Sequence, residues 1–214
     1  MIAQEGRLIL IGLLILIFPF GIYVHASDIK ILYYIYLFFG SFYIFTIYFF
    51  RDPQRNIPTD DSIILSPADG KIVSIKEIND DEVGSSSQVI SIFLSLFDVH
   101  VFRYPFSGKV KSVNSSKGKF VPAFAHNAPD VNEQTTTVIE TNNFTIKIKQ
   151  IAGLVARRIL CYATPNEIVK KGDRMGFIRF GSRADIVVSS KIDVCVKLGE
   201  KVKAGESVIG RINQ

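Results

Sequence analysis

Cysteine and histidine are scarce in this chain of 214 residues, and their scarcity narrows the chemistry it can perform. Two cysteines, Cys161 and Cys195, are too few for a disulfide framework and do not form a metal-binding motif. They suit a reducing compartment, and we expect both thiols to be buried. Three histidines are present. His25 lies in a short polar connection between apolar segments, which leaves His100 and His126 as candidate bases.

Charged residues are missing from two long stretches. Residues 8–24 and 31–50 carry no charge, and each approaches the roughly 20 apolar residues that cross the hydrocarbon core of a bilayer. Residues 25–30 between them allow only a tight turn. The sequence therefore predicts a membrane-anchoring helical hairpin over residues 1–50, with both outer ends on one face of the membrane.

Two features leave the first apolar segment open to other interpretations. Pro19 and Gly21 lie within it, so the sequence does not decide whether it spans the bilayer or re-enters it. A cleaved signal peptide over residues 1–24 is an alternative, because Arg7 precedes the apolar run. In that case residues 31–50 would remain as the anchor.

The charge balance points to lipid and away from nucleic acid. Lysine and arginine number 25 against 20 acidic residues, the pI is near 9.1, and the excess belongs to residues 51–214. No basic helix, RNA-binding motif or zinc-finger spacing is present. A basic region beside a membrane anchor favours anionic lipid headgroups as partners. The positive-inside rule, applied to Arg7, Arg51 and Arg55, predicts a cell-membrane protein with its globular part on the cytoplasmic side.

Residues 51–214 read as strands separated by tight turns, without a repeat of fixed period. Asp69-Gly70 stands between two apolar runs, a strong signal for a β-hairpin. Residues 191–210 alternate in polarity and have glycines at their corners. We therefore expect a mainly β domain, a compact β-barrel or sandwich with lipoyl-like hairpins, behind the helical hairpin.

One glycine–serine pair interrupts a strand pattern between Arg174 and Val188. Gly181-Ser182 lies between apolar runs, and a glycine in such a place usually marks a bulge or a hairpin corner. A second interpretation is chemical. Gly181 has no Cβ, which leaves its carbonyl carbon open to attack. The Ser182 hydroxyl could attack this carbon if a base removes the hydroxyl proton.

Candidates for that base lie elsewhere in the chain. His100 follows an apolar run and stands near Asp98 and Arg103. An aspartate that orients a histidine, which in turn deprotonates a serine, is the logic of a catalytic triad. Asp69 could supply that carboxylate. Asp69 as a turn residue and His100 as a structural histidine remain the plainer interpretations.

Several short motifs occur in a fixed order. They are Phe50-Arg-Asp-Pro, Ser66-Pro-Ala-Asp-Gly-Lys, Phe97-Asp-Val-His-Val-Phe-Arg-Tyr-Pro-Phe-Ser-Gly, Asn132-Glu133, Gln150-Ile-Ala-Gly-Leu-Val-Ala-Arg-Arg-Ile and Gly176-Phe-Ile-Arg-Phe-Gly-Ser. Together they resemble the short, archaeal-type form of phosphatidylserine decarboxylase proenzyme over essentially the whole chain. Any one motif is weak, whereas the ordered set is specific.

The resemblance implies a self-cleaving enzyme that makes its own pyruvoyl cofactor from Ser182. Cleavage between Gly181 and Ser182 would give a β chain, residues 1–181, and an α chain, residues 182–214, which stay associated as a heterodimer. The pyruvoyl group forms a Schiff base with phosphatidylserine, and loss of carbon dioxide yields phosphatidylethanolamine in phospholipid biosynthesis. In the family, an aspartate and a histidine assist the serine. Here these are Asp69 and His100, and no metal is implied.

The sequence departs from the family pattern at one place. Larger members carry two histidines three residues apart, which divide cleavage and decarboxylation between them. Here His100 is followed by Arg103, so either His100 serves both steps or Arg103 replaces one function. Arg103, Arg157 and Arg158 are candidate partners for the substrate's phosphate or carboxylate, or else solvated surface charges. His126 is interpreted as a loop residue.

Two other classes of protein compete with this interpretation. A membrane-anchored, non-enzymatic carrier or adaptor module is one, because Val202-Lys-Ala-Gly-Glu is similar to lipoyl and biotinyl domains. Such carriers need a lysine at a hairpin tip, typically beside methionine, and Lys191 has no such neighbour. A pyruvoyl enzyme acting on a soluble amino acid is the other. Neither the helical hairpin nor the basic charge would help such an enzyme to bind a soluble substrate.

Overall fold

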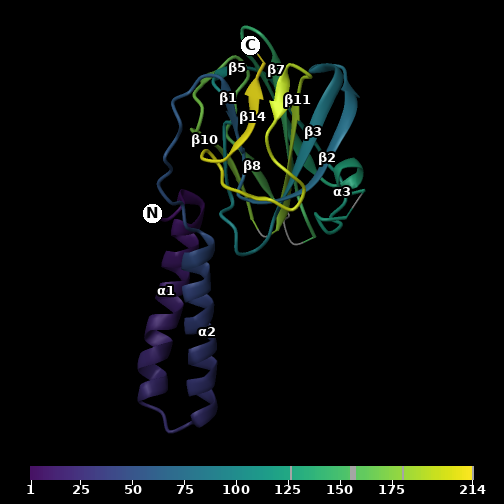
Figure 1. Cartoon of the computed structure of the whole chain (residues 1–214). Coiled ribbons are helices and arrows are strands. Elements are labelled where there is room, and N and C mark those ends of the chain that lie inside the picture. Colours follow the sequence, from purple (N-terminus) through teal and green to yellow (C-terminus); the bar gives the residue numbers. More distant parts are fainter. Residues whose placement is uncertain (126, 155–157, 180, 214) are drawn as a thin grey trace. The chain divides into compact units, whose positions relative to one another are not determined.

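The computed structural model describes residues 1–125, 127–154, 158–179 and 181–213, which form two compact units. The first unit, Met1–Gln54, contains two helices, and the second, Arg55–Gln214, contains all the strands. Figure 1 shows both units. The mainly β fold behind two apolar helices is the one that the sequence predicts.

The first unit is an antiparallel pair of helices, α1 (Gln4–His25) and α2 (Lys30–Phe49) (Figure 1). Both are long and apolar enough to cross a membrane, with mean hydropathies of 2.5 and 1.6, and few of their residues are buried. Helix α1 continues through Pro19, and its 22 residues span roughly 33 Å at 1.5 Å per residue. A Cβ on Gly21 would lie 2.8 Å from the Tyr36 ring, so this glycine lets the helices approach closely.

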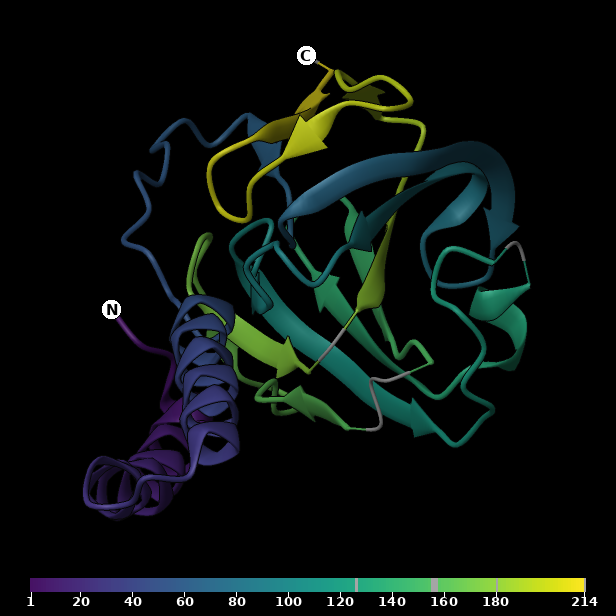
Figure 2. The same ribbon diagram turned by 90° about the horizontal axis from the view of Figure 1, so that it is seen from below.

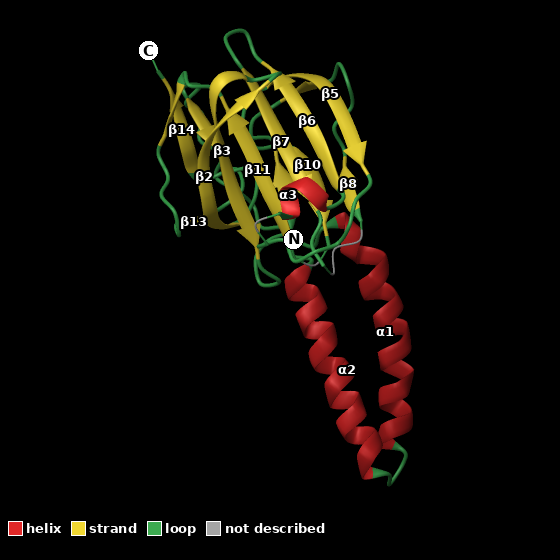
Figure 3. Cartoon of the chain, turned by 90° about the vertical axis from the view of Figure 1, so that its right-hand side faces the viewer, coloured by secondary structure: helices red, strands yellow, loops and turns green. Residues whose placement is uncertain are grey.

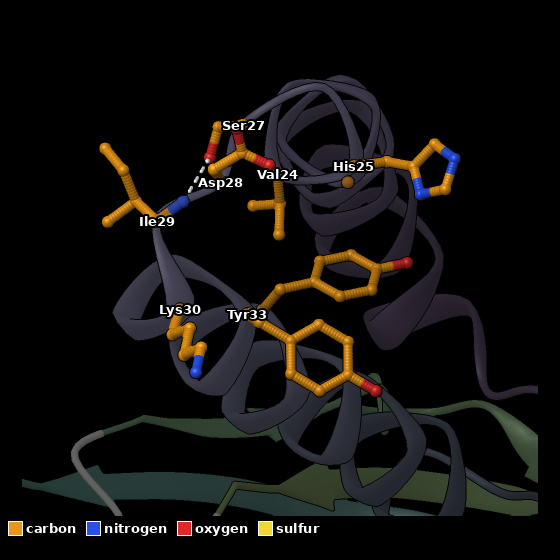
Figure 4. A pocket seen from close by; sticks show the side chains of 9 residues that line it. Val24, His25, Ser27, Asp28, Ile29, Lys30 and Tyr33 are labelled. Atoms are coloured by element: carbon orange, nitrogen blue, oxygen red, sulfur yellow. Dashed lines mark hydrogen bonds between the residues drawn. The ribbon is translucent and has the colours of Figure 1, made fainter.

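The turn between the two helices lines a pocket of about 470 Å³ (Figure 4). The polar residues His25, Asp28 and Lys30 line it together with Tyr33. The Ile29 amide donates a hydrogen bond to Oγ of Ser27 across 3.5 Å. His25 therefore belongs to the helical unit, as the sequence predicts.

The second unit consists of strands and one short helix, α3 (Ala128–Val131). Its strands are β1 (Ile63–Leu65), β2 (Gly70–Asp80), β3 (Gly84–Leu94), β4 (Val101–Arg103), β5 (Gly108–Ser116), β6 (Gln134–Glu140), β7 (Thr145–Ile151), β8 (Ile159–Cys161), β9 (Ile168–Val169), β10 (Arg174–Ile178), β11 (Ser182–Val188), β12 (Ile192–Val194), β13 (Lys201–Val202) and β14 (Val208–Ile212).

Within the described residues, the strands form three antiparallel sheets. The largest has eight strands in the order β13-β2-β3-β11-β7-β6-β5-β9, and most of them lie side by side in Figure 3. The two smaller sheets have the orders β1-β14-β12 and β4-β10-β8. The strands curve around a common interior (Figure 2), which is filled by buried side chains such as Ile92, Ile148 and Ile186. This curled, barrel-like arrangement fits the compact β-barrel or sandwich expected from the sequence.

The β-hairpin expected at Asp69-Gly70 does not form. Strand β1 pairs with β14, whereas β2, which begins at Gly70, pairs with β3 and β13. Gly70 has a φ of +153°, and a Cβ on it would lie 2.2 Å from the Phe93 carbonyl oxygen. The turn therefore carries the chain from one sheet to another. Its glycine lets the backbone pass close to the Phe93 carbonyl group.

The cysteines are free thiols, but they are not both buried. Cys161 is half-buried on β8, and Cys195 is exposed. The expectation of two buried thiols is thus wrong: Cys161 is only partly buried, and Cys195 follows the short strand β12 at the surface. Among the described residues, no three His, Cys, Asp or Glu side chains form a group that could hold a metal ion.

Candidate active site

The glycine–serine pair lies where the chain passes from one sheet to another. Strand β10 belongs to a small sheet and β11 is central in the eight-stranded sheet, with Gly181 immediately before β11. Gly181 has a φ of +65°, a left-handed conformation that glycine adopts at little cost. Ser182 is fully buried, and its Oγ has no hydrogen-bond partner in the described part of the chain. A buried hydroxyl thus directly follows a residue whose backbone conformation favours glycine.

His100, the residue before β4, faces this crossing. Its ring is fully buried, and Nδ1 lies 2.9 Å from the Asp98 carbonyl oxygen, to which it can only donate. The Gly181 amide donates to Nε2 across 3.3 Å. Together these two hydrogen bonds require the neutral tautomer with its proton on Nδ1. The Nε2 lone pair therefore accepts from the amide of Gly181, the residue whose carbonyl carbon Ser182 would attack.

A second glycine packs against the Gly181 carbonyl group. A Cβ built on Gly153 would lie 2.3 Å from the carbonyl oxygen of Gly181 and 3.2 Å from Cβ of Ala123. Real Cβ atoms do not approach backbone this closely. The segment after β7 therefore passes directly over the carbonyl that Ser182 would attack.

A buried asparagine holds this segment in place. Asn132, 2 % exposed, donates from Nδ2 to the Ala152 carbonyl across 2.7 Å and to the Val121 carbonyl across 2.8 Å. Its Oδ1 accepts from the Val121 amide across 2.9 Å. One side chain thus joins the loop after β5 to the residue preceding Gly153, and it fixes the two loops around the crossing.

Asp69 is also buried, but its described hydrogen bonds are with residues other than His100. Nη2 of Arg55 lies 2.8 and 3.0 Å from its two carboxylate oxygens, and the Ala204 amide donates to Oδ1 across 2.8 Å. Burial raises the pKa of Asp69, against the lowering effect of the Ala204 amide and Arg55, and the nearby charge of Asp98 adds to the rise. His100 is oriented by the Asp98 carbonyl group, which sequence reasoning missed because a backbone atom leaves no motif.

The three candidate arginines are differently placed. Arg103 donates from Nη1 to the Gly172 carbonyl across 3.0 Å, which ties it to the β9–β10 turn. Arg158 is exposed. Arg157 and His126 lie outside the described residues. The described contacts bring none of these side chains onto Ser182.

An ion pair that the sequence analysis overlooked anchors the start of β11. Arg183 donates from Nε to Oδ1 of Asp185 across 2.6 Å, and from Nη2 to Oγ of Ser91 across 2.7 Å. Arg183 is 8 % exposed and Asp185 is 3 % exposed. Opposite charges at i and i+2 in a strand share one face, so their spacing was a usable signal. The residue immediately after Ser182 is thereby fixed to the neighbouring strand.

The fold and the site together define a mainly β enzyme in which a buried histidine contacts the residue before a buried serine, where the chain crosses between two sheets. The family model described as phosphatidylserine decarboxylase matches residues 42–210. The chain belongs to this family.

Known relatives agree over most of the chain. A phosphatidylserine decarboxylase proenzyme of Chlorobium chlorochromatii is 44% identical over 170 residues, which cover 79% of this chain and 80% of the relative. Those of Desulfotalea psychrophila and Geobacter metallireducens are 42% and 37% identical over 189 and 210 residues. They cover 87% and 98% of this chain, and 87% and 95% of the respective relatives. The match favours the enzyme over the non-enzymatic carrier.

Proposed function

We propose that this protein is a self-cleaving, pyruvoyl-dependent decarboxylase that converts phosphatidylserine to phosphatidylethanolamine and carbon dioxide. The observation that carries the proposal is the hydrogen bond from the Gly181 amide to Nε2 of His100, next to a buried Ser182 hydroxyl that has no partner in the described part of the chain. The names of the relatives, all proenzymes of this activity, support it.

Self-cleavage follows from the chemistry of these groups. His100 takes the proton from Oγ of Ser182, and the oxygen attacks the Gly181 carbonyl carbon. The peptide C–N bond breaks and an ester bond forms, which frees the Ser182 nitrogen. Loss of the Ser182 α-proton then expels the Gly181 carboxylate and leaves dehydroalanine. Hydrolysis releases ammonia and gives a pyruvoyl group at residue 182.

The residues around position 182 fit such a group. The serine side chain is buried on a central strand, and the hydrogen bond from Arg183 to Ser91 helps to hold that strand on β3 after a cut. When present, the group serves as an electron sink for the pair of electrons that carbon dioxide leaves behind. His100, buried beside it, can hold a proton at Nε2, and Gly153 covers the site from one side. One histidine is thus available for both steps.

A lipid substrate is supported by the surface around the site, which we call the apolar rim: Phe97, Phe124 and Leu154. These side chains are 65%, 69% and 58% exposed. Phe97 belongs to the loop before His100, while Phe124 and Leu154 follow Ala123 and Gly153 directly. Large apolar side chains exposed on segments that adjoin the site are typical of a membrane-contacting surface.

Basic side chains accompany the rim. Lys117 and Lys119 are exposed in the loop that Asn132 ties to Ala152, and Arg158 is exposed beyond Leu154. Their charges suit anionic lipid headgroups. With the two apolar helices, they support a membrane protein. We place its β unit on the cytoplasmic side, following the positive-inside rule.

Mass spectrometry of the purified full chain tests the proposal. We expect a β chain ending at Gly181 and an α chain of residues 182–214 that is blocked by a pyruvoyl group and still co-purifies with the β chain. Ser182→Ala should remain one chain, because no hydroxyl is left to attack. Cleavage in that variant, or an intact wild-type chain, would contradict the mechanism, and release of carbon dioxide from phosphatidylserine in liposomes tests the substrate.

A further inference from the structure

A glutamine side chain without a hydrogen-bond partner is buried in the interior of the β unit. Gln150 on β7 is 0% exposed, and neither Oε1 nor Nε2 has a partner in the described part of the chain. Leaving a buried polar group unpaired costs roughly 1–3 kcal/mol. An apolar residue would avoid this cost, so the retained amide calls for a role in binding a ligand or an ordered water.

The strand register places Gln150 on the same face of the sheet as Ser182. Ile146 and Ile148 of β7 belong to the core, and Gln150 continues their alternation. Ala184 of β11 pairs with Gln150, and Ser182 lies two residues earlier on the same face of that strand. Ser182 and Gln150 are therefore diagonal neighbours, about 7–8 Å apart and within reach of a long side chain.

Strand β10 covers the amide of Gln150 with a glycine. A Cβ on Gly176 would lie 2.7 Å from Nε2 and 3.3 Å from Oε1 of Gln150, and 2.2 Å from the Leu160 carbonyl oxygen. The amide thus lies between β7 and β10. These strands and β11 meet around the crossing that holds Gly181, so the amide stands on the interior side of the reacting residue.

We propose that Gln150 binds the headgroup of the substrate by donating an N–H of its amide to the carboxylate that leaves as carbon dioxide. This inference rests on the proposed function. Decarboxylation removes the negative charge of that carboxylate, so a cation beside it would stabilise the ground state more than the transition state. A neutral amide can orient the carboxylate while stabilising the charged ground state less than a cation would.

Two arginines that could otherwise meet the carboxylate, Arg183 and Arg103, have other partners. Arg183 turns to the opposite face of the sheet, where it binds Asp185 and Ser91. Arg103 donates to the Gly172 carbonyl. Gln150 is consequently the uncharged donor best placed to meet a carboxylate on the interior side of Ser182.

Reductive trapping separates this contact from a structural role. Phosphatidylserine and phosphatidylethanolamine both carry a primary amine, but only phosphatidylserine carries the carboxylate. Cyanoborohydride supplies the hydride that fixes either amine to the keto carbon of residue 182, and the two adducts on the α chain differ by the mass of carbon dioxide. In the full chain in detergent, Gln150→Leu should reduce total trapping from subsaturating phosphatidylserine about tenfold, and trapping of phosphatidylethanolamine less than twofold.

The adduct is scored per cleaved α chain, so partial self-cleavage of the variant does not obscure the result. Gln150→Met, which is more flexible, serves as a second variant. Gln134→Leu is the matched control. Gln134 pairs with Ile151 on the opposite face of the sheet and donates to the Pro129 carbonyl, so both lipids should be trapped as in the wild type.

A second readout needs no processed enzyme. In the uncleaved Ser182→Ala background, Gln150→Leu removes two unpaired buried atoms and should raise the unfolding midpoint by a few degrees. A glutamine with a structural partner would show a lowered midpoint. That result, or equal changes in trapping for the two lipids, would overturn the inference. A wild-type chain that is never cleaved and traps no lipid would instead refute the proposed function.

Discussion

The carbonyl oxygen of Gly181 occupies the space where a side chain of residue 153 would stand, because a Cβ on Gly153 would lie only 2.3 Å from it. This carbonyl is the electrophile of the proposed self-cleavage. Two segments far apart in the sequence therefore meet at the bond that breaks, and the geometry of one depends on the lack of a side chain in the other.

Gly153→Ala should slow self-cleavage at least tenfold, since the new methyl group must displace either the loop or the Gly181 carbonyl from its position. A displacement of about 1 Å at a reacting group costs on the order of a hundredfold in rate. Cleavage is followed by gel electrophoresis over time. Gly40→Ala is the control, because nothing lies within 4 Å of a Cβ at that position. Cleavage of Gly153→Ala at the wild-type rate would show that the contact has no part in the reaction.

His100→Ala should reduce the rate of self-cleavage by about 10²–10⁴, the usual contribution of a general base. His25→Ala is the matched control, since that histidine belongs to the helical unit. If His100→Ala were cleaved normally but released no carbon dioxide, the histidine would act only in decarboxylation.

The apolar rim should matter for substrate in a bilayer. Phe97→Ser removes an exposed apolar side chain, and we expect severalfold slower turnover of phosphatidylserine in liposomes, with unchanged turnover of a short-chain, monomeric phosphatidylserine. Ile168→Ser is the control. Ile168 is 82% exposed and pairs with Lys109, which lies opposite Glu140 at the far end of β6. If the two variants slowed turnover in liposomes equally, the apolar rim would have no special role in substrate access.

The ion pair of Lys147 and Asp80 predicts a dependence of stability on pH. Burial raises the pKa of Asp80, but hydrogen bonds from Lys147 and from backbone amides outweigh it and leave the pKa below the ordinary value. A carboxyl with a lowered folded-state pKa stabilises the fold above its unfolded pKa, about 3.9, and this stabilisation is lost as the pH falls through the folded value.

Lys147→Met should therefore lower the free energy of unfolding by roughly 1.5–3 kcal/mol near neutral pH, and the difference from wild type should shrink below about pH 4. Thermal unfolding of the full chain in detergent at several pH values measures this. Lys149→Met is the control, because Lys149 lies on the same face of β7 but has no ion pair in the described part of the chain. A difference that stays constant with pH would contradict the assignment.

The architecture was largely predictable from local patterns. Uncharged runs predict α1 and α2, and strand-length apolar runs predict the β domain. The alternation of Ile146, Lys147, Ile148 and Lys149 also sets the two faces of β7, and it shows Gln150 as a polar residue at a core position. The position of Gln150 in this alternation therefore marks it as a candidate binding residue from the sequence alone.

The arrangement of the site was less predictable, because tertiary packing decides it. The turn at Asp69-Gly70 joins two sheets instead of closing a hairpin. Asp69 itself binds Arg55 and the Ala204 amide, and its part in catalysis stays a prediction. The proximity of His100 to Gly181 was suggested by the family resemblance, not by any spacing between residues so far apart.

Strand β11 is hydrogen-bonded to β3 on one side and β7 on the other, while β13 and β14 pair with β2 and β1. A break before residue 182 would thus leave a C-terminal peptide whose strands belong to sheets formed mainly by the longer chain. Only non-covalent contacts would hold this peptide in place. Once denatured, the two pieces would diffuse apart, and reassembly would depend on their concentration. Maturation would then be a one-way event, and the lifetime of the mature enzyme would be set by how slowly it unfolds.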